Sequence, residues 1–423
     1  MNDNREALSK YDPDVFFALK GEERRQRYGL ELIPSENFAY PEVLSLLGSA
    51  FTNKYSEGYP GRRYYGGQEF TDIVEELARD RAKKVFRAEH ANVQPLSGSP
   101  MNQAIFHSFL NPDEKVLSMD LSHGGHLTHG APVSHMGKIY NFIRYKTLSE
   151  KNGELDWNQI RELAHLHKPK IILCGHSSYP KDIDYKLFKD IADEVGALTM
   201  ADVSHTGGWI AANLLNNPMD VGFDFMTTTT HKSMRGPRGG MILCKKEHAK
   251  VIDSSVFPGL QGGPHMNQVA ATAVTMKKIS SGEFIDYARQ VLKNAKVLSD
   301  NLRRKGIDLI TGGTENHLMV LNTISSVNLN GKEAEFILDK VNITTNKQVI
   351  PDDPRPPLSP SGVRVGTPAI TTRGMVESNM TQISDWIVKA LKNYNNDSSL
   401  TKIKAEVQDF CAKFQLPGIH KDI

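Results

Sequence analysis

Apolar and polar positions alternate along the chain in a pattern that predicts helices and strands in turn. The segment 71–86 (TDIVEELARDRAKKVF) has helical periodicity, and 115–120 (KVLSMD) predicts a short strand. Further along, 169–180 (PKIILCGHSSYP) predicts a strand that ends in a turn, 185–196 (YKLFKDIADEVG) a helix, and 197–205 (ALTMADVSH) the next strand. Such alternation favours right-handed βαβ units and a mainly parallel sheet with helices on both faces. Ligands of these sheets bind at the carboxyl ends of the strands.

A lysine stands at one predicted strand end. The four threonines at 227–230 are β-branched and favour a strand, and GGMILC at 239–244 predicts the following strand. Lys232 lies at the junction between them, before the turn GPRGG. A lysine in this position is either a solvated loop charge or part of a binding site, and the rest of the chain has to decide between the two.

The pattern divides the chain into three predicted parts. Residues 1–30 predict a charged N-terminal helical arm with a short apolar stripe, and arms of this kind often pack on a partner chain. Residues 31–280 contain the alternation of helices and strands and form the predicted large domain. A long amphipathic helix beginning near residue 280 opens the predicted smaller α+β domain, 281–423.

Composition is that of an ordinary globular protein, with 39% hydrophobic and 24% charged residues and a formal net charge of +2 over 423 residues. This balance gives no reason to expect a nucleic acid or an anionic membrane as partner. The three cysteines, Cys174, Cys244 and Cys411, are far apart and odd in number, which favours reduced thiols. Because no apolar segment is long enough for a signal peptide or a membrane span, we expect a cytoplasmic protein.

A carboxylate follows another predicted strand. Asp202 ends the strand within TMADVSH, thirty residues before Lys232, and His205 lies three residues further on. By itself, a buried aspartate is more often a helix cap or a structural hydrogen-bonding group. However, an amine that can form a Schiff base, together with a carboxylate that holds a pyridine nitrogen protonated, is what pyridoxal phosphate requires of a protein. The two residues together therefore predict a pyridoxal phosphate site.

The phosphate of such a cofactor needs hydrogen-bond donors. Ser97, Gly98 and Ser99 precede Pro100 at a predicted first helical position, where backbone N–H groups and the helix dipole attract an anion. A second glycine-rich turn, PGLQGGPH, contains Gly263 and is a candidate to complete the phosphate site. An ordinary serine-capped helix and a plain loop are the alternative interpretations of these two segments.

Three histidines, His123, His126 and His129, lie three residues apart and raise the question of a metal site. The Gly-Gly between the first two breaks any regular helical face, so we expect no metal, and His126 is instead a candidate to stack on a pyridine ring. Arg364 lies within VRVG between branched apolar residues and needs an anionic partner. That partner is either a protein carboxylate in a salt bridge or the carboxylate of an amino-acid substrate.

The segment 53–67 (NKYSEGYPGRRYYGG) combines tyrosines and charges with glycines and has no periodicity, which is typical of an active-site loop or a subunit contact. Together with LELIPSENF, ANVQPLSGSP, HGGHLTHG, TTTTHKSMRGPRGG, FPGLQGGPH and RVGTPAIT, it resembles the motifs of serine hydroxymethyltransferase, in order and over nearly the whole chain. The resemblance implies a fold-type I pyridoxal phosphate enzyme. Its large domain would have a mainly parallel seven-stranded sheet between helices, and a smaller α+β domain would follow.

The resemblance also implies an activity: reversible transfer of the hydroxymethyl group of L-serine to tetrahydrofolate, which gives glycine and 5,10-methylenetetrahydrofolate. Pyridoxal phosphate would be held as a Schiff base on Lys232, and tetrahydrofolate would be the co-substrate. Because some site residues would come from the neighbouring subunit, a homodimer would be the minimum active unit, with a tetramer also open.

Roles for individual residues follow from the same resemblance. The implied cofactor contacts are Asp202 at the pyridinium nitrogen, His126 on the ring, Ser178 and His205 near the phenolic oxygen, Ser97, Gly98, Ser99 and His231 at the phosphate, and Tyr55 and Gly263 from the neighbouring subunit. The implied substrate contacts are Arg364, Ser35 and Tyr65 at the carboxylate, Glu57 at the serine hydroxyl, and Leu121, Gly125, Leu127 and Asn346 around the folate. Thr229, at the end of the threonine strand, is counted with the catalytic residues. Arg235 and Arg238 would favour the neutral amine of Lys232.

Some positions depart from the commonest family pattern. Pro356 stands where many relatives have a serine near the folate, and Met101 stands where a small residue is usual. Asp202 is followed by VSHTGG, whereas MAH or ISH with a single following glycine is more frequent. The alternative function is therefore a folate-independent aldolase or transaldolase acting on β-hydroxy amino acids. A catalytically silent pyridoxal phosphate binder is a further alternative, disfavoured because Lys232, Glu57 and Arg364 are all present and no basic appendage is found.

Overall fold

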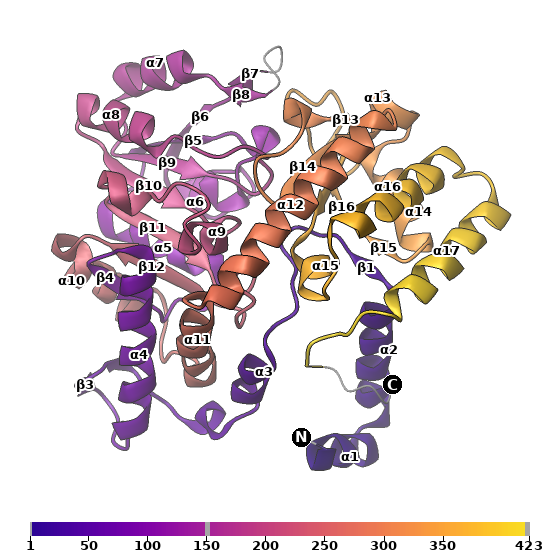
Figure 1. Cartoon of the computed structure of the whole chain (residues 1–423). Helices are drawn as coiled ribbons and strands as arrows, with labels where there is room; N and C mark the ends of the chain where they lie inside the picture. Colours follow the sequence, from indigo (N-terminus) through magenta and orange to yellow (C-terminus); the bar gives the residue numbers. More distant parts are fainter. Residues whose placement is uncertain (1, 149–152, 419–423) are drawn as a thin grey trace.

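A seven-stranded sheet lies at the centre of the larger part of the protein (Figure 1). The computed structural model describes residues 2–148 and 153–418. In spatial order the strands are β4 (His90–Asn92), β12 (Gly240–Cys244), β11 (Phe225–Thr229), β10 (Leu198–Asp202), β9 (Ile171–Gly175), β5 (Lys115–Met119) and β6 (Asn141–Tyr145). All strands of this sheet except β12 point the same way. The prediction of a mainly parallel seven-stranded sheet between helices is confirmed.

Helices cover both faces of this sheet because its strands are apolar on both sides. Along β9, Ile171 and Leu173 pack on one face with side chains of α5 (Gly98–Phe109), and Ile172 and Cys174 pack on the other. The helices on that second face are α4 (Glu69–Phe86), α7 (Trp157–His167), α8 (Tyr185–Val195) and α11 (Met266–Ile279). The short helix α9 (Gly207–Ala211) follows β10 on the same side.

The carboxyl ends of β9, β10 and β11 meet at one edge of the sheet. Asp202 pairs with Gly175 on one side and with Thr227 on the other. A Cβ atom on Gly175 would lie 2.1 Å from the Asp202 carbonyl oxygen, and the φ angle of this glycine is +117°. Gly175 is therefore required for the close approach of the two strand ends, and this edge is where βα folds bind ligands.

An antiparallel sheet forms the core of the C-terminal part. Its strands, in spatial order, are β13 (Asp308–Leu309), β14 (Leu318–Asn322), β17 (Gly362–Gly366) and β16 (Asn346–Gln348). One apolar cluster joins it to α12 (Gly282–Arg304), α14 (Gly331–Lys340), α16 (Glu377–Lys392) and α17 (Asp397–Cys411). The long helix α12 runs along the boundary between the large sheet and this part (Figure 1).

The chain enters the C-terminal part early. Strand β1 (Leu30–Glu31) pairs in parallel with β15 (Ile343–Thr344), and Leu30 and Leu32 belong to the apolar cluster of the C-terminal part. Residues 30–32 thus pack with that part before the chain continues to the large sheet. The domain borders at residues 30 and 280 stay predictions.

The first residues form two helices, α1 (Asn2–Tyr11) and α2 (Pro13–Tyr28), of which α2 contacts α17 (Figure 1). Tyr11 and Phe17 on these helices are 91% and 80% exposed. Large apolar side chains this exposed fit a surface that contacts another chain. Within the described residues, no helix has both the length and the apolar character needed to cross a bilayer.

Candidate active site

Asp202 is held by four hydrogen bonds at the end of β10. Its Oδ1 accepts from the backbone N–H and the hydroxyl of Ser204, at 3.0 and 2.6 Å. Its Oδ2 accepts from the Asn102 amide at 2.8 Å and from His129 Nε2 at 3.2 Å. Burial alone would raise the pKa of this carboxyl, but the hydrogen bonds that it accepts from His129 and Ser204 hold the pKa well below its usual range. Asp202 is therefore a fixed carboxylate, suited to a cationic ring nitrogen.

Two of these partners were not among the predicted site residues. Asn102 lies on α5 and also donates to the hydroxyl of Thr128. His129 accepts the backbone N–H of His126 at Nδ1, so its proton lies on Nε2, where it is donated to Asp202. The only sequence signals were the position of Asn102 one turn into the predicted phosphate helix and the place of His129 in HGGHLTHG.

Lys232 lies just beyond β11, close to Asp202 and Arg364. Burial and the positive charges of Arg364 and Arg238 lower its pKa to about 8, although the carboxylate of Asp202 opposes the shift. Arg238 thus acts as expected, whereas Arg235 points elsewhere: its guanidinium lies 4.1 Å from the centre of the Tyr40 ring. The amine of Lys232 loses its proton more readily than an ordinary lysine does and is suited to form a covalent bond to a carbonyl.

The start of α5 packs tightly against the ends of β11 and β12. A Cβ on Gly98 would lie 3.0 Å from Cγ2 of Thr229, and a Cβ on Gly240 would lie 2.6 Å from the Ser97 carbonyl oxygen. Ser97 is the N-cap residue of α5, but its side chain makes no capping hydrogen bond. The simple serine-cap interpretation therefore does not describe this helix start, and the Ser97 hydroxyl remains available to a ligand.

His231 provides a second unused polar group in the same region. Its Nδ1 is buried and has no hydrogen-bond partner within the described residues. Burial and the charge of Lys232 lower the pKa of His231 to about 3, so the ring is neutral. Buried polar atoms are rarely left unpaired. A phosphate bound at this helix N-terminus would accept from the Ser97 hydroxyl, and its negative charge would favour a second proton on the His231 ring, at Nδ1.

The three histidines of HGGHLTHG do not converge. His123 turns to Thr147, whose backbone N–H it accepts at 3.1 Å. Among the described residues, His126, His129 and Asp202 have potential ligand atoms within 4.8 Å of one another. That arrangement already serves the hydrogen bonds of the Asp202 carboxylate. Burial lowers the pKa of His126 to about 4, so it is a neutral flat ring beside Asp202.

Arg364 is buried in the middle of β17. Its Nε donates to the Asn346 amide oxygen at 3.2 Å, and its Nη1 donates to the carbonyl of Ser177. No carboxylate in the described part of the chain forms an ion pair with it, so the salt-bridge interpretation fails there. Burial lowers the pKa of Arg364 to about 10, which leaves it charged at neutral pH. A buried guanidinium of this kind calls for an anionic ligand.

The residues therefore fit pyridoxal phosphate: a fixed carboxylate, a reactive amine and a phosphate cradle meet at one sheet edge. A family model described as serine hydroxymethyltransferase matches residues 8–387 of the 423. The chain belongs to the serine hydroxymethyltransferase family. It is an enzyme of glycine and serine hydroxymethyl transfer with the fold of type I pyridoxal phosphate enzymes, and this family uses pyridoxal phosphate with tetrahydrofolate as co-substrate.

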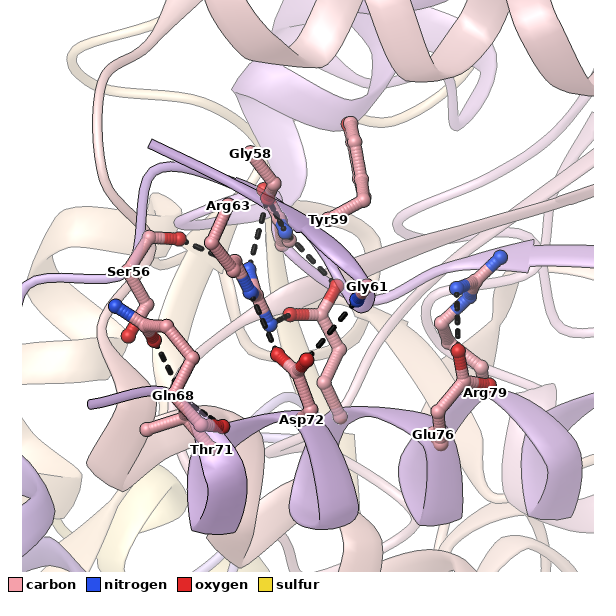
Figure 2. A network of polar contacts seen from close by, with 12 residues as sticks. Ser56, Gly58, Tyr59, Gly61, Arg63, Gln68, Thr71, Asp72, Glu76 and Arg79 are labelled. Atoms are coloured by element: carbon pink, nitrogen blue, oxygen red, sulfur yellow. Dashed lines mark hydrogen bonds and ion pairs between the residues drawn. The ribbon is translucent and has the colours of Figure 1, made fainter. Parts of the chain in front are cut away.

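The glycine-rich loop that resembles a family motif is anchored by a buried arginine (Figure 2). Arg63 donates to Asp72 at 2.8 Å and to Glu75 at 2.6 Å, both on α4. It also donates to the carbonyls of Ser56 and Gly58 within the loop. The Arg63 and Glu75 side chains are 3% and 0% exposed, so this network fixes the loop on α4 and holds the neighbouring residues in place.

The loop presents Tyr55 and Tyr65 outward. Tyr55 and Tyr65 are 57% and 47% exposed, and their ring centroids lie 5.2 Å apart. A Cβ on Gly263 would lie 3.1 Å from the Tyr55 ring and 3.5 Å from Cγ of Glu57. Tyr55, Tyr65, Glu57 and Gly263 thus form one group at the surface. Glu57 is not among the charges that act most strongly on Lys232.

Three of the predicted folate residues follow β5, and the fourth, Asn346, lies on β16. Leu121 and Leu127 begin the short turns η2 (Leu121–His123) and η3 (Leu127–His129), and Leu127 is 49% exposed. Between them, Gly125 has no room for a Cβ, which would lie 2.4 Å from the Met119 carbonyl oxygen. Asn346 lies beside Arg364 on the neighbouring strand. Met101, which departs from the family pattern, is fully buried in the core beneath the sheet.

Ser35, Ser178 and His205 are three further predicted site residues. Ser35 lies in the turn after Pro34, which packs on Gly366 at the end of β17, next to the strand of Arg364. Ser178 lines a small cavity with His123 and Tyr179, and its backbone N–H donates to the Gly124 carbonyl. The carbonyl that contacts Arg364 belongs to the preceding residue, Ser177. His205 is buried against His317, with the two rings 5.6 Å apart.

Proposed function

We propose that the protein catalyses reversible hydroxymethyl transfer between L-serine and tetrahydrofolate, giving glycine and 5,10-methylenetetrahydrofolate. The observation that carries this proposal is Arg364, a buried guanidinium with no carboxylate partner in the described residues, close to Lys232. This arrangement suits an α-amino acid, because the carboxylate can bind Arg364 while the amino group lies near the lysine. Family membership supports the remaining elements of the reaction.

When bound, pyridoxal phosphate supplies an aldehyde for amines and an electron-withdrawing ring that stabilises negative charge at the α-carbon of the amino acid. Lys232 would anchor this cofactor. Asp202, held as a carboxylate by its four hydrogen bonds, would keep the ring nitrogen protonated, and the charge on that nitrogen would make the ring electron-withdrawing. Ser97, Gly98, Ser99 and His231 would hold the phosphate, and His126 would pack on the ring.

The pKa values of the site residues suit these roles. Lys232 has a pKa of about 8, so it both gives up and regains a proton near neutral pH, as an amine that exchanges with a substrate amine must. His126 and His231 have pKa values lowered mainly by burial and carry no charge. The positive charges in the site are therefore those of Arg364, Arg238 and protonated Lys232, and they are available to bind the carboxylate and phosphate.

The site is completed, in this proposal, by a second copy of the chain. Tyr55, Tyr65 and Glu57, on the loop anchored by Arg63, form one surface group with Gly263. Beside them, α4 carries an exposed apolar stripe, with Phe70, Ile73 and Leu77 at 66, 51 and 39% exposure. Exposed apolar stripes of this length mark contact surfaces. In a homodimer with two-fold symmetry, each chain would supply this group to the other's Lys232.

Glu57 from the second copy would then hold or accept the proton of the serine hydroxyl, and Tyr65 would assist Arg364 at the carboxylate. Ser35, Ser178 and His205 would contact the amino acid and the phenolic oxygen, and Thr229 would support the lysine from the strand end. Leu121, Gly125, Leu127 and Asn346 would line the folate site.

We place the large and small domains at 31–280 and 281–423, with the arm 1–30 on the partner.

The test uses L-serine labelled with carbon-13 at Cβ and the purified, cofactor-loaded protein. The proposal predicts that the label passes to 5,10-methylenetetrahydrofolate, with one equivalent of glycine formed, and that glycine formation slows strongly when tetrahydrofolate is left out. If the label is instead released as free formaldehyde at the same rate with or without folate, the protein is the folate-independent aldolase, and the proposal is wrong.

A further inference from the structure

A tryptophan is connected to His205 through two successive hydrogen bonds. Trp209, on α9, is fully buried, and its Nε1–H donates to Nδ1 of His317 at 2.9 Å. An indole nitrogen can only donate a hydrogen bond. The Nδ1 atom of His317 must therefore be an acceptor and carry no proton. The indole, which has no acceptor, alone decides this assignment.

The proton of His317 must then lie on its other nitrogen. Burial holds the pKa of His317 well below the ordinary value, so the ring is neutral and has a single N–H. That N–H is at Nε2, and the Pro34 carbonyl, which hydrogen-bonds His317, favours it. Nε2 of His317 lies 3.5 Å from Nδ1 of His205, and the two rings are inclined by only 22°.

The same reasoning extends to His205. Two N–H groups cannot face each other at this distance without repulsion, so Nδ1 of His205 carries no proton and accepts from His317. Burial and the charges of Lys232 and Arg364 keep the pKa of His205 well below the ordinary value, so this ring is also neutral. The single proton of the neutral His205 ring therefore lies on Nε2.

We propose that Trp209 is a positioning residue, which acts through His317 to fix His205 in the neutral tautomer with its proton on Nε2. His205 is then always a hydrogen-bond donor from Nε2 and never an acceptor there. This N–H would donate to an oxygen of the cofactor or substrate, a role that rests on the proposed function. The assignment of the tautomer does not rest on the proposed function, because it follows from contacts within this chain.

The direct test is nitrogen-15 NMR of the cofactor-loaded protein labelled in its histidines. Long-range nitrogen–proton correlations distinguish the two neutral tautomers, and His205→Gln and His317→Gln variants assign the signals. The wild-type protein should show both rings protonated at Nε2. A His317 signal from a ring protonated at Nδ1 overturns the proposal without any variant, so the test does not depend on whether a tryptophan variant folds.

Trp209→Phe removes the N–H and keeps an aromatic ring. The expected results are a mixture of tautomers at His317 and His205 and a roughly five- to tenfold fall in kcat, the size of one lost neutral hydrogen bond, with little change in the KM for serine. Trp386→Phe is the matched control, because Trp386 is also buried and donates its N–H, to Glu406, in the C-terminal part. It should alter neither the signals nor kcat.

The two claims fail separately. Unchanged His205 and His317 signals in a folded Trp209→Phe protein, or an equal loss of kcat in Trp386→Phe, would contradict the positioning role. Fixed tautomers in a wild-type protein that transfers no hydroxymethyl group would leave Trp209 as the residue that sets them and would instead refute the proposed reaction.

Discussion

The side-chain amide of Asn102 donates a 2.8 Å hydrogen bond to the carboxylate of Asp202, and so joins α5 to the end of β10. The amide oxygen of Asn102 accepts from the hydroxyl of Thr227 on the next strand, β11. One buried asparagine thus connects the helix whose N-terminus would hold the cofactor phosphate with the carboxylate that would hold the cofactor ring. In the proposed site, this contact would set the spacing between the phosphate and ring contacts of the cofactor.

Replacing Asn102 by Ala should weaken cofactor binding. The variant removes one of four donors to a buried carboxylate, and a hydrogen bond to a charged group contributes about 1.5–3 kcal/mol. We expect the Kd for pyridoxal phosphate to rise by at least roughly tenfold, measured by titrating the apoprotein with the cofactor. Asn301→Ala, which changes a buried asparagine bonded to Thr381 in the C-terminal part, should leave this Kd unchanged. Equal Kd values for Asn102→Ala and wild type would show that the contact is incidental.

Lys232 should destabilise the apoprotein below pH 8. Its pKa is about 8 in the folded chain and 10.5 as the ordinary value. Between these values the unfolded chain binds more protons, so stability rises with pH there, and the cost of burying the charge is fully present below pH 8. Lys232→Met apoprotein should therefore be more stable than wild type at pH 7, by on the order of 3 kcal/mol.

The measurement is urea unfolding of both apoproteins at several pH values. The stability difference between Lys232→Met and wild type should shrink as pH rises from 8 and should vanish near 10.5. Subtracting the two proteins removes the contribution of every other titrating group. A difference that stays constant from pH 7 to 10 would mean that the Lys232 pKa is not lowered in the folded state.

Arg364→Lys should impair amino-acid binding and spare the cofactor. A lysine keeps the charge but loses the planar pair of donors that matches a carboxylate. We expect the KM for serine to rise roughly 10- to 100-fold, in line with the loss of about 1.5–3 kcal/mol from a charged hydrogen bond. The visible absorbance of the bound cofactor should be unchanged. A normal KM in the variant would remove Arg364 from the substrate site.

Two inactive variants should restore activity when combined. Lys232→Ala lacks the amine and Glu57→Ala lacks the carboxylate, so each homodimer should be inactive or nearly so. If each site takes Lys232 from one chain and Glu57 from the other, a mixed dimer contains one intact site. Unfolding and refolding the two variants together should then give roughly one quarter of wild-type activity, since half of the dimers are mixed and each has one of two sites intact. No recovery, in a mixture shown to be dimeric, would place Lys232 and Glu57 in the same chain's site.

Much of the fold could be predicted because the strands in question are short apolar runs that end in polar residues. Asp202 is the last residue of one strand and Lys232 comes three residues after the end of the next, and parallel strands bring their carboxyl ends together. Asn102, Trp209 and His317 could not be found in this way. Their roles depend on packing between segments about 100 residues apart in the sequence, which no local pattern records.

The side chain of Arg235 shows that sequence also fails to predict contacts between residues that are close together in the chain. Its neighbours in sequence place it next to Lys232, but its backbone is left-handed, with φ of +59°, and its side chain turns to Tyr40. The charge that Arg364 contributes at Lys232 comes instead from a strand of the C-terminal part, more than a hundred residues away. Sequence spacing identifies the residues of the site better than it identifies which of them interact.

The most direct test of the central claim is the absorbance of the purified, cofactor-loaded protein with glycine, recorded with and without tetrahydrofolate. A long-wavelength band should appear strongly only when glycine and folate are both present, because the proposed amino-acid and folate sites would act on the same cofactor. A glycine spectrum that does not change when tetrahydrofolate is added would contradict folate-dependent hydroxymethyl transfer. It would favour the aldolase, with Pro356 as the first residue to exchange for serine.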